Sequence, residues 1–356
     1  MTYYPKQTHV IPLATILRER RLPVPGEVLV RQGASVVAAD VVARAAVSTH
    51  HAVLDVASRL GISAARVDDF LVVDRGQKVE AGQVLAERRR FLRKVRVTAP
   101  VEGVIALVED GRVVLEAEPE VIELRAAMGG VVAAITPRYG VQIQTVGALI
   151  QGVWGNGGVQ TGPLRVVSAA ESGELPASAI NLDHGGAIIV SRVAIGEEAL
   201  SAAVEQRVRG VVAPSMRASL VPVVKALEGT SLVLTEGFGA RPMSDVVFKL
   251  LREHEGREAV LIGAEPGRWQ SGRPEVIVPL LSHTQMAAIP RVGEPVRVGN
   301  RVRLLREPHR GLVGVVTALP DAPMPVDSGI KALGAQVDAG EEQTVFVPFA
   351  NLELLG

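Results

Sequence analysis

The sequence contains no cysteine, which excludes disulfide partners, thiolate zinc sites, iron–sulfur clusters and cysteine nucleophiles. Its first 21 residues lack an uninterrupted apolar core followed by a small-residue cleavage site, so no secretory signal is evident. The longest uncharged run, 139–164, carries seven glycines and four glutamines and therefore predicts strands and turns instead of a membrane span. We expect a soluble cytoplasmic protein that does not enter a membrane.

The chain also has no net charge and few aromatic residues. Lys+Arg and Asp+Glu both number 38, and the resulting zero net charge excludes a whole-molecule basic field for holding nucleic acid. Any such binding must come from local basic patches. Aromatic residues make up 3% of the chain, which provides poorly for stacking on unpaired bases.

Signatures of catalysis and metal binding are missing too. The seven histidines include one adjacent pair, His50 and His51, but adjacent positions on a helix do not face one ligand. Asp183 beside His184 is a candidate general base or metal ligand, although a turn histidine at a domain entry is the interpretation we favour. No G-x-S-x-G motif is present. We therefore predict no catalytic residue, metal or cofactor, and we favour a non-catalytic protein over an enzyme.

The first third of the chain is organised by an internal repeat. With 356 residues, 47% of them hydrophobic, two or three domains with buried cores are expected. After a tail over 1–21, Val30–Val36 recurs as Val73–Val79, each alternating apolar and polar residues around a glycine turn. A hairpin turning at residues 110–111 follows. This pattern over 22–120 resembles the barrel-sandwich hybrid of biotinyl and lipoyl carrier domains.

Two features of that segment bear on function. Residues 49–70 predict a helical insertion, which is either a helix-turn-helix or, as we favour, a cover over one end of the barrel. Carrier domains display a modified lysine at a hairpin tip, but Lys94 lacks the flanking residues of both kinds of carrier, which argues against a carrier role. The run Arg88–Arg96 holds six positive charges in nine residues and indicates either phosphate contact or, preferably, a solvated hairpin face.

The middle of the chain, 121–283, begins with an apolar, glycine-rich stretch and then alternates strands with helices. The expected strands are Ala187–Ser191, Gly210–Ala213, Ser231–Thr235 and Ala259–Gly263, and the expected helices are Gly196–Val208, Ser219–Leu227 and Met243–His254. Continuous apolar strands that alternate with helices at this spacing are typical of right-handed βαβ units. We therefore predict a central parallel α/β domain.

The loop over 235–242 is the candidate ligand site of that domain, because ligands of parallel sheets bind beyond the carboxyl ends of the strands. Gly237 and Gly239 let backbone amides turn toward a ligand, and Arg241 supplies positive charge beside Glu236. An anionic small molecule with a phosphate or a carboxylate is what such a loop would hold. The alternative is an ordinary strand-to-helix turn with its phenylalanine tucked into the core.

The C-terminal segment, 284–356, carries the most specific pattern. A short apolar strand at Gly299–Leu304 leads to a basic loop, a glycine and a second strand, and the segment closes on Thr344–Phe349. This pattern resembles the KOW motif, the SH3-like β-barrel of the transcription factor NusG and of several ribosomal proteins. The resemblance implies attachment to RNA, the ribosome or RNA polymerase. The residues expected to contact such a partner are Arg301, Arg303, Arg306, Arg310 and Gly311.

The predicted fold class is multidomain α/β plus all-β, with an N-terminal barrel-sandwich hybrid, a central parallel α/β domain and a C-terminal SH3-like barrel. As a whole the chain resembles bacterial KOW-domain proteins. The first hypothesis is a non-catalytic cytoplasmic adaptor or scaffold whose C-terminal domain contacts RNA, a ribonucleoprotein or a protein complex. The second is an enzyme or maturation factor that binds a phosphorylated or carboxylated small molecule at Glu236–Arg241. The third is a structural subunit that uses all three domains for contacts.

Overall fold

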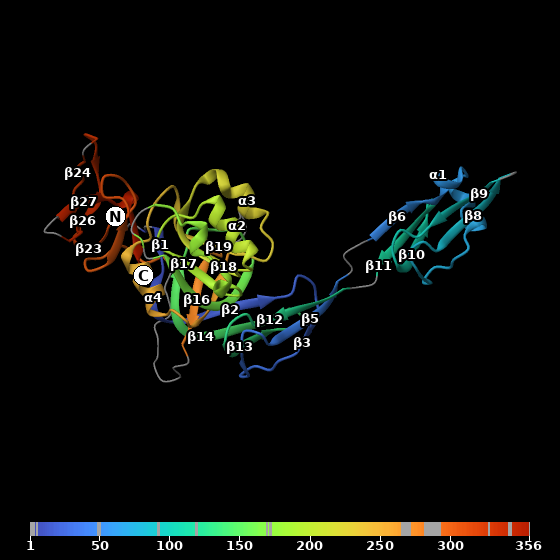
Figure 1. Cartoon of the computed structure of the whole chain (residues 1–356), viewed down its shortest axis with the longest axis horizontal. Helices are drawn as coiled ribbons and strands as arrows, with labels where there is room; N and C mark the ends of the chain where they lie inside the picture. Colours follow the sequence, from blue (N-terminus) through green and yellow to red (C-terminus); the bar gives the residue numbers. More distant parts are fainter. Residues whose placement is uncertain are drawn as a thin grey trace.

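A computed structural model describes residues 4, 6–47, 51–90, 93–117, 120–168, 170, 173–264, 272–280, 293–326, 328–340 and 344–355. Strands account for 49% of the residues and helices for 15%. Figure 1 shows a central body, a C-terminal part at one end and an arm at the other. Within the described ranges, no helix is both long enough and apolar enough to cross a membrane.

The central body is built on an 11-stranded mixed sheet, which we call the central sheet. Its strands, in spatial order, are β15 (Trp154–Gly155), β19 (Ser231–Phe238), β18 (Gly210–Met216), β17 (Ile188–Ser191), β16 (Val159–Ser168), β20 (Glu258–Ile262), β21 (Glu275–Pro279), β14 (Gly140–Gln151), β13 (Gly130–Thr136) and β4 (Ser35–Val36). Strand β2 (Val10–Arg21) also pairs with β14, antiparallel over most of its length. The N-terminal segment therefore belongs to the same sheet as the middle of the chain.

The prediction of a central parallel α/β domain is wrong. Strands β16 to β19 do pair in parallel, but β16 continues into antiparallel pairing with β20, and β20, β21, β14 and β13 are antiparallel throughout. The helices of this region are short: α2 (Glu197–Glu205), α3 (Val221–Lys225) and α4 (Asp245–Glu253). The expected strands lie close to their predicted positions. Because the apolar stretch before residue 168 and the first 21 residues add antiparallel strands, the result is one mostly β body.

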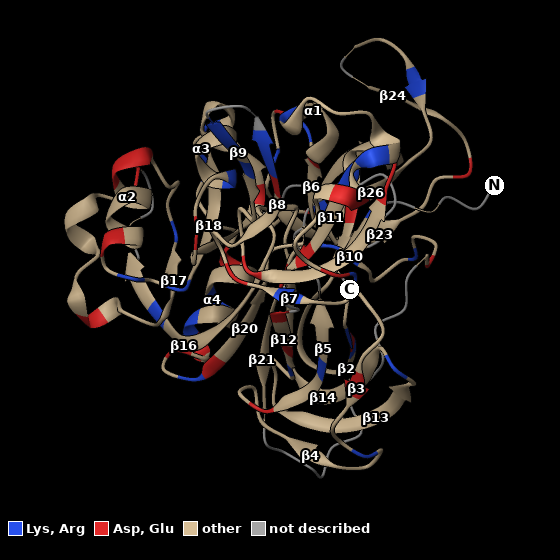
Figure 2. Cartoon of the chain, turned by 90° about the vertical axis from the view of Figure 1, so that its right-hand side faces the viewer, with Lys and Arg blue, Asp and Glu red and all other residues tan. Residues whose placement is uncertain are grey.

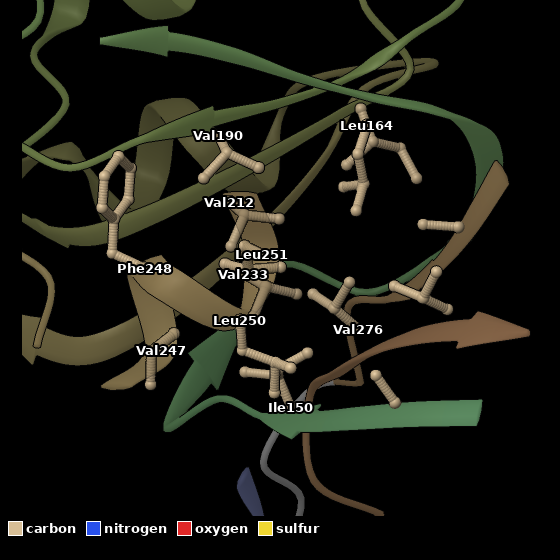
Figure 3. Packing of buried hydrophobic residues seen from close by; sticks show 14 of the residues in the cluster. Ile150, Leu164, Val190, Val212, Val233, Val247, Phe248, Leu250, Leu251 and Val276 are labelled. Atoms are coloured by element: carbon tan, nitrogen blue, oxygen red, sulfur yellow. The ribbon is translucent and has the colours of Figure 1, made fainter. Parts of the chain in front are cut away.

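Hydrophobic clusters pack on both faces of the parallel strands. All seven residues of β18 and all four of β17 are buried, which is why these strands are apolar without alternation. On one face α4 contributes Val247, Phe248 and Leu251 to a cluster with strand residues such as Val190 and Val212 (Figure 3). The opposite face is covered by α2 and α3. The edge formed by the ends of β17, β18 and β19 is therefore held between two packed layers.

The N-terminal repeat does not form one barrel-sandwich hybrid over 22–120. Its first copy, Val30–Val36, reaches the central sheet through β4, which pairs with β13. The flanking strands β3 (Glu27–Val28), β5 (Val41–Val47) and β12 (Glu120–Arg125) form a small sheet beside the body. Its second copy lies in the arm, residues 51–117, which lies apart from the body in Figure 1. The strands of the arm are β6 (His51–Asp55), β7 (Lys78–Val79), β8 (Val84–Arg90), β9 (Arg93–Thr98), β10 (Gly103–Glu109) and β11 (Arg112–Ala117). The two copies of the repeat, 43 residues apart in the sequence, thus belong to two separate parts of the structure, the body and the arm.

The expected helical insertion over 49–70 is present only in part. It begins with strand β6, continues as the five-residue helix α1 (Val56–Leu60) and ends in two 3-10 turns, Ala64–Arg66 and Asp68–Phe70. Residues 49 and 50 lie outside the described residues. Val56, Leu60 and Val67 pack into a hydrophobic cluster whose members all belong to the arm. This segment is therefore a part of the arm's own core.

The C-terminal part is a six-stranded sheet, which we call the C-terminal sheet. Its strands, in spatial order, are β1 (Lys6–Thr8), β28 (Leu352–Leu355), β22 (Arg301–Leu304), β23 (Val313–Ala318), β26 (Gly334–Asp338) and β27 (Thr344–Pro348), and a hairpin of β24 (Met324–Pro325) and β25 (Lys331–Ala332) extends from it. Strand β1 joins this sheet by parallel pairing with β28. The predicted boundary between residues 283 and 284 lies outside the described residues.

Candidate functional site

A cleft lies between the central sheet and the C-terminal sheet. It has a larger lobe of about 830 Å³ and a smaller lobe of about 480 Å³, and Glu236, Arg241, Arg310 and Gly311 line both. One wall is the loop over 239–244, which follows β19. The facing wall is the loop over 305–312, between β22 and β23. The candidate ligand loop and the candidate partner-contact residues, predicted as separate sites, are thus brought together in one place.

The loop after β19 is held by its glycines and by a buried serine. Gly237 and Gly239 have φ angles of 103° and 124°, a region that side chains other than glycine rarely adopt. The Ser215 hydroxyl accepts a hydrogen bond from the Arg241 N–H at 2.8 Å and donates one to the Arg241 carbonyl at 2.9 Å. Gly239 N–H donates to the Met216 carbonyl at 2.9 Å. These bonds fix the backbone from which the Arg241 side chain starts.

The inner wall of the cleft is a buried ion network around Arg303. Its Nη1 donates to Glu236 Oε2 at 2.7 Å, and its Nη2 donates to Glu353 Oε2 at 2.5 Å. Glu353 also accepts from the Thr8 hydroxyl and lies 3.4 Å from Lys6 Nζ. Lys6, Glu353 and Arg303 are register partners on the neighbouring strands β1, β28 and β22. The network therefore connects β1 and β28 of the C-terminal sheet, through Arg303, to Glu236 of β19 in the central sheet.

Burial and pairing act against each other in this network. Burial lowers the pKa of Arg303, but the charges of Glu236 and Glu353 outweigh it and raise the pKa above the ordinary value. Burial raises the pKa of Glu353, but the Arg303 guanidinium and the Thr8 hydroxyl outweigh it and lower the pKa. Arg303 and Glu353 are therefore both charged at neutral pH.

The structure corrects the expected role of Arg303. The sequence predicts that Arg303 contacts a partner, whereas only 4% of its surface is exposed. Val302 and Leu304 face the core of the C-terminal sheet, so Arg303 points the other way, toward the central sheet. Its function is to connect the two sheets. Arg301, Arg306, Arg310 and Gly311 are exposed, as a contact surface requires.

Four arginines form the rim of the cleft: Arg241, Arg301, Arg306 and Arg310. None of the four makes an ion pair with any residue in the described part of the chain. Burial lowers the pKa of Arg241, and the positive charge of Arg310 lowers it further, although Glu307 and Glu236 act in the opposite direction. Two cationic groups on opposite walls therefore repel each other across the cleft. An anion between them would replace that repulsion with two attractions.

An aromatic pair lines the smaller lobe. The rings of Trp154 and Phe238 meet edge to face, with centroids 5.7 Å apart and an interplanar angle of 61°. Phe238 ends β19 and remains 39% exposed. The alternative that this phenylalanine is tucked into the core is therefore wrong. Sequence reasoning missed Trp154 as a site residue, because its link to Phe238 depends on the pairing of β15 with β19.

The other candidates lie away from the cleft. His184 ends a 3-10 turn, and its Nδ1 accepts a hydrogen bond from the Asn181 N–H at 3.1 Å, which is the turn histidine that we favoured. Among the residues described, no cluster of three or more His, Cys, Asp or Glu could hold a metal ion. Basic residues gather on hairpin β8–β9 and acidic ones on α2 (Figure 2). On that hairpin, Lys94 and Arg96 pair with Glu87.

No protein-family model matches the chain, and the curated proteins contain no match to it either.

Proposed function

We propose that the protein binds a phosphate- or carboxylate-bearing ligand in the cleft between the central sheet and the C-terminal sheet. The observation that carries the proposal is that Arg241 and Arg310 line both lobes of one cleft from opposite walls, and that neither forms a salt bridge with a described residue. A guanidinium group presents a planar fork of donors that matches phosphate and carboxylate oxygens. The ligand would neutralise both arginines at once.

The construction of the cleft supports this assignment. Arg241 is anchored through its backbone to the buried Ser215. Arg310 belongs to a loop whose preceding strand, β22, is tied to the central sheet by Arg303. Donors that are already positioned lose little freedom when a ligand binds, so more of the interaction energy appears as affinity.

Glu236, the acidic residue of the loop over 235–242, has a different role from Arg241. Glu236 accepts from Arg303 and, at 3.3 Å, from the Ser244 N–H at the start of α4. Its charge is therefore paired mainly with Arg303, and it forms no salt bridge with the arginines of the rim. This arrangement leaves Arg241 and Arg310 available for an anion.

Isothermal titration calorimetry with pyrophosphate tests the proposal. Loss of one charge-assisted contact costs about 1.5–3 kcal/mol, so Arg241→Gln and Arg310→Gln should each weaken binding by about 10- to 100-fold. Arg112→Gln, an equal change of charge on the exposed surface of the arm, is the matched control and should leave affinity unchanged. Pyrophosphate binding that is unaffected by both cleft variants would rule the proposal out.

A second candidate function is the non-catalytic cytoplasmic adaptor implied by the KOW-like pattern. It is favoured by the exposure of Arg301 on β22 and of Arg306 and Arg310 in the loop that follows β22. The cytoplasmic location remains a proposal, supported by the cysteine-free composition. Affinity purification at low and high salt, with and without ribonuclease, tests this candidate. RNA that is lost steeply as salt rises would support it, since counter-ion release makes phosphate contacts salt-sensitive.

A further inference from the structure

We infer that the ligand of the cleft is a nucleotide, with its base against Phe238 and its phosphate between Arg241 and Arg310. This inference rests on the proposed function and names the class of its ligand. It depends on the smaller lobe, where the aromatic pair and the arginines line one cavity. A bare phosphate or a small carboxylate would use the arginines and leave the aromatic wall of that lobe without a partner.

The orientation of the aromatic pair leaves a face free for stacking. Trp154 meets Phe238 at 61°, so one ring braces the other by edge-to-face contact and does not cover it as a parallel stack would. Phe238 keeps 39% of its surface exposed although it ends a strand whose preceding residues are almost all buried. Every nucleobase has a planar face that stacks on an aromatic side chain.

Phe238 is the last residue of β19, and Arg241 lies three residues further on, in the loop that follows. The left-handed glycines at 237 and 239 flank the phenylalanine, and the two hydrogen bonds of Ser215 hold the arginine. The smaller lobe of about 480 Å³ lies within the range of roughly 300–1,000 Å³ that is typical of small-ligand pockets. One short loop therefore presents a stacking surface and a phosphate ligand to a cavity of suitable size.

The charges around Phe238 fit a nucleotide better than a neutral aromatic compound. Arg306, Arg310 and Lys6 line the smaller lobe together with Arg241. Lys6 and Arg303 are engaged by Glu353, but Arg306 and Arg310 have no ion pair with a described residue. A ligand with one base and two phosphates would use Phe238, Arg241 and both of these arginines. Stacking and charge do not distinguish the bases, so we expect adenine and guanine nucleotides to bind within a few-fold of each other.

Tryptophan fluorescence tests the inference, because the chain has two tryptophans, Trp154 and Trp269. In a Trp269→Phe background, Trp154 reports on the smaller lobe. We expect ADP to change its fluorescence and to bind about 10-fold more tightly than pyrophosphate, which is the gain that stacking of one base provides. ADP and GDP should have similar affinities.

Variants of Phe238 separate this inference from the proposed function. Phe238→Leu should bind pyrophosphate as the parent protein does and should lose the advantage of ADP, whereas Phe238→Tyr should retain it. Equal affinities of ADP and pyrophosphate, or an ADP advantage that survives Phe238→Leu, would overturn the inference and leave anion binding intact. Absence of pyrophosphate binding by the parent protein, or pyrophosphate binding that Arg241→Gln and Arg310→Gln leave unaffected, would instead count against the proposed function.

The same assay distinguishes two sources of the nucleotide. A 5′-phosphorylated hexaribonucleotide that binds more tightly than ADP supports recognition of an RNA end, which could contact both Phe238 and Arg306 in the smaller lobe. Tighter binding of ADP supports a free nucleotide. Failure of both to exceed pyrophosphate would refute the stacking role of Phe238.

Discussion

Arg303 donates from both Nε and Nη2 to the same carboxylate oxygen of Glu353, at 2.9 and 2.5 Å, and both residues are almost completely buried. They are register partners on the antiparallel strands β22 and β28. A third bond, from Nη1 to Glu236, carries the contact across to the central sheet. The inner wall of the cleft is therefore an ion network whose charges are already paired with one another.

Removing the cation from this network should destabilise the protein. In Arg303→Leu, Glu236 and Glu353 would share a buried site without a counter-charge, and breaking a buried pair in this way costs about 3–5 kcal/mol. Urea unfolding followed by circular dichroism measures the loss. Arg301→Leu, two residues earlier on the same strand but exposed, should change stability by less than about 0.5 kcal/mol. Equal effects of the two variants would show that the network is not stabilising.

The pH dependence of stability should reflect Glu353. Its pKa is lowered below the ordinary value of 4.5 in the folded state, so the stabilisation is fully present above that value and is lost as pH falls through the folded pKa. Glu353→Gln removes this titration. The difference in unfolding free energy between the parent protein and Glu353→Gln should stay constant above about pH 5.5 and shrink below about pH 4.5. A difference that does not vary with pH would contradict the paired state.

Gly239 should matter for ligand binding more than for folding. At φ 124° a β-branched residue is strained by about 1–3 kcal/mol, and relief of that strain would move the loop that carries Arg241. We therefore expect Gly239→Val to weaken pyrophosphate binding by about tenfold in calorimetry. Gly33→Val is the control, since Gly33 also has positive φ, at 84°, with no atom near its missing Cβ. The control should lose some stability and keep full affinity.

Deletion of the arm should leave the stability of the rest of the protein unchanged. All the residues of its hydrophobic cluster lie within the arm, and Val47 and Glu120, on either side of it, are direct partners on antiparallel strands. Partners of this kind are about 5 Å apart, so a two-residue Asn-Gly turn can replace residues 48–119. Urea unfolding monitored by Trp154 fluorescence should give an unchanged midpoint. A lowered midpoint would reveal contacts between arm and body that stabilise the fold.

Local sequence signals predicted individual strands and the unusual backbone at Gly237 and Gly239 well. Continuous apolar runs correctly indicated β17, β18 and the first part of β19, because strands buried on both faces have no alternation. The glycines at 237 and 239 indicated an unusual backbone that the φ angles confirm. These features depend on residues close together in the chain.

Sheet membership and burial between sheets could not be predicted in this way. Arg301 and Arg303 are two residues apart and face the same side of β22, yet one is exposed and the other has 4% exposure. The difference arises because Glu236, far away in the sequence, covers only one of them. Trp154 is a similar case, since it lies in the cleft only because it packs against Phe238, which is far away in the sequence. A low overall number of aromatic residues says nothing about where two of them meet.

The pairing of β1 with β28 has a consequence for synthesis of the protein on the ribosome. Thr8 and Glu353 are hydrogen-bonded across a separation of 345 residues, so the segment Lys6–Thr8 must wait for its neighbour until almost all of the residues described here have been made. Non-local contacts of this kind form late and slowly. Glu353 supplies the counter-charge that Arg303 needs. A nascent chain that has emerged only as far as β27 therefore cannot yet form the inner wall of the cleft, which is completed by Glu353 of β28.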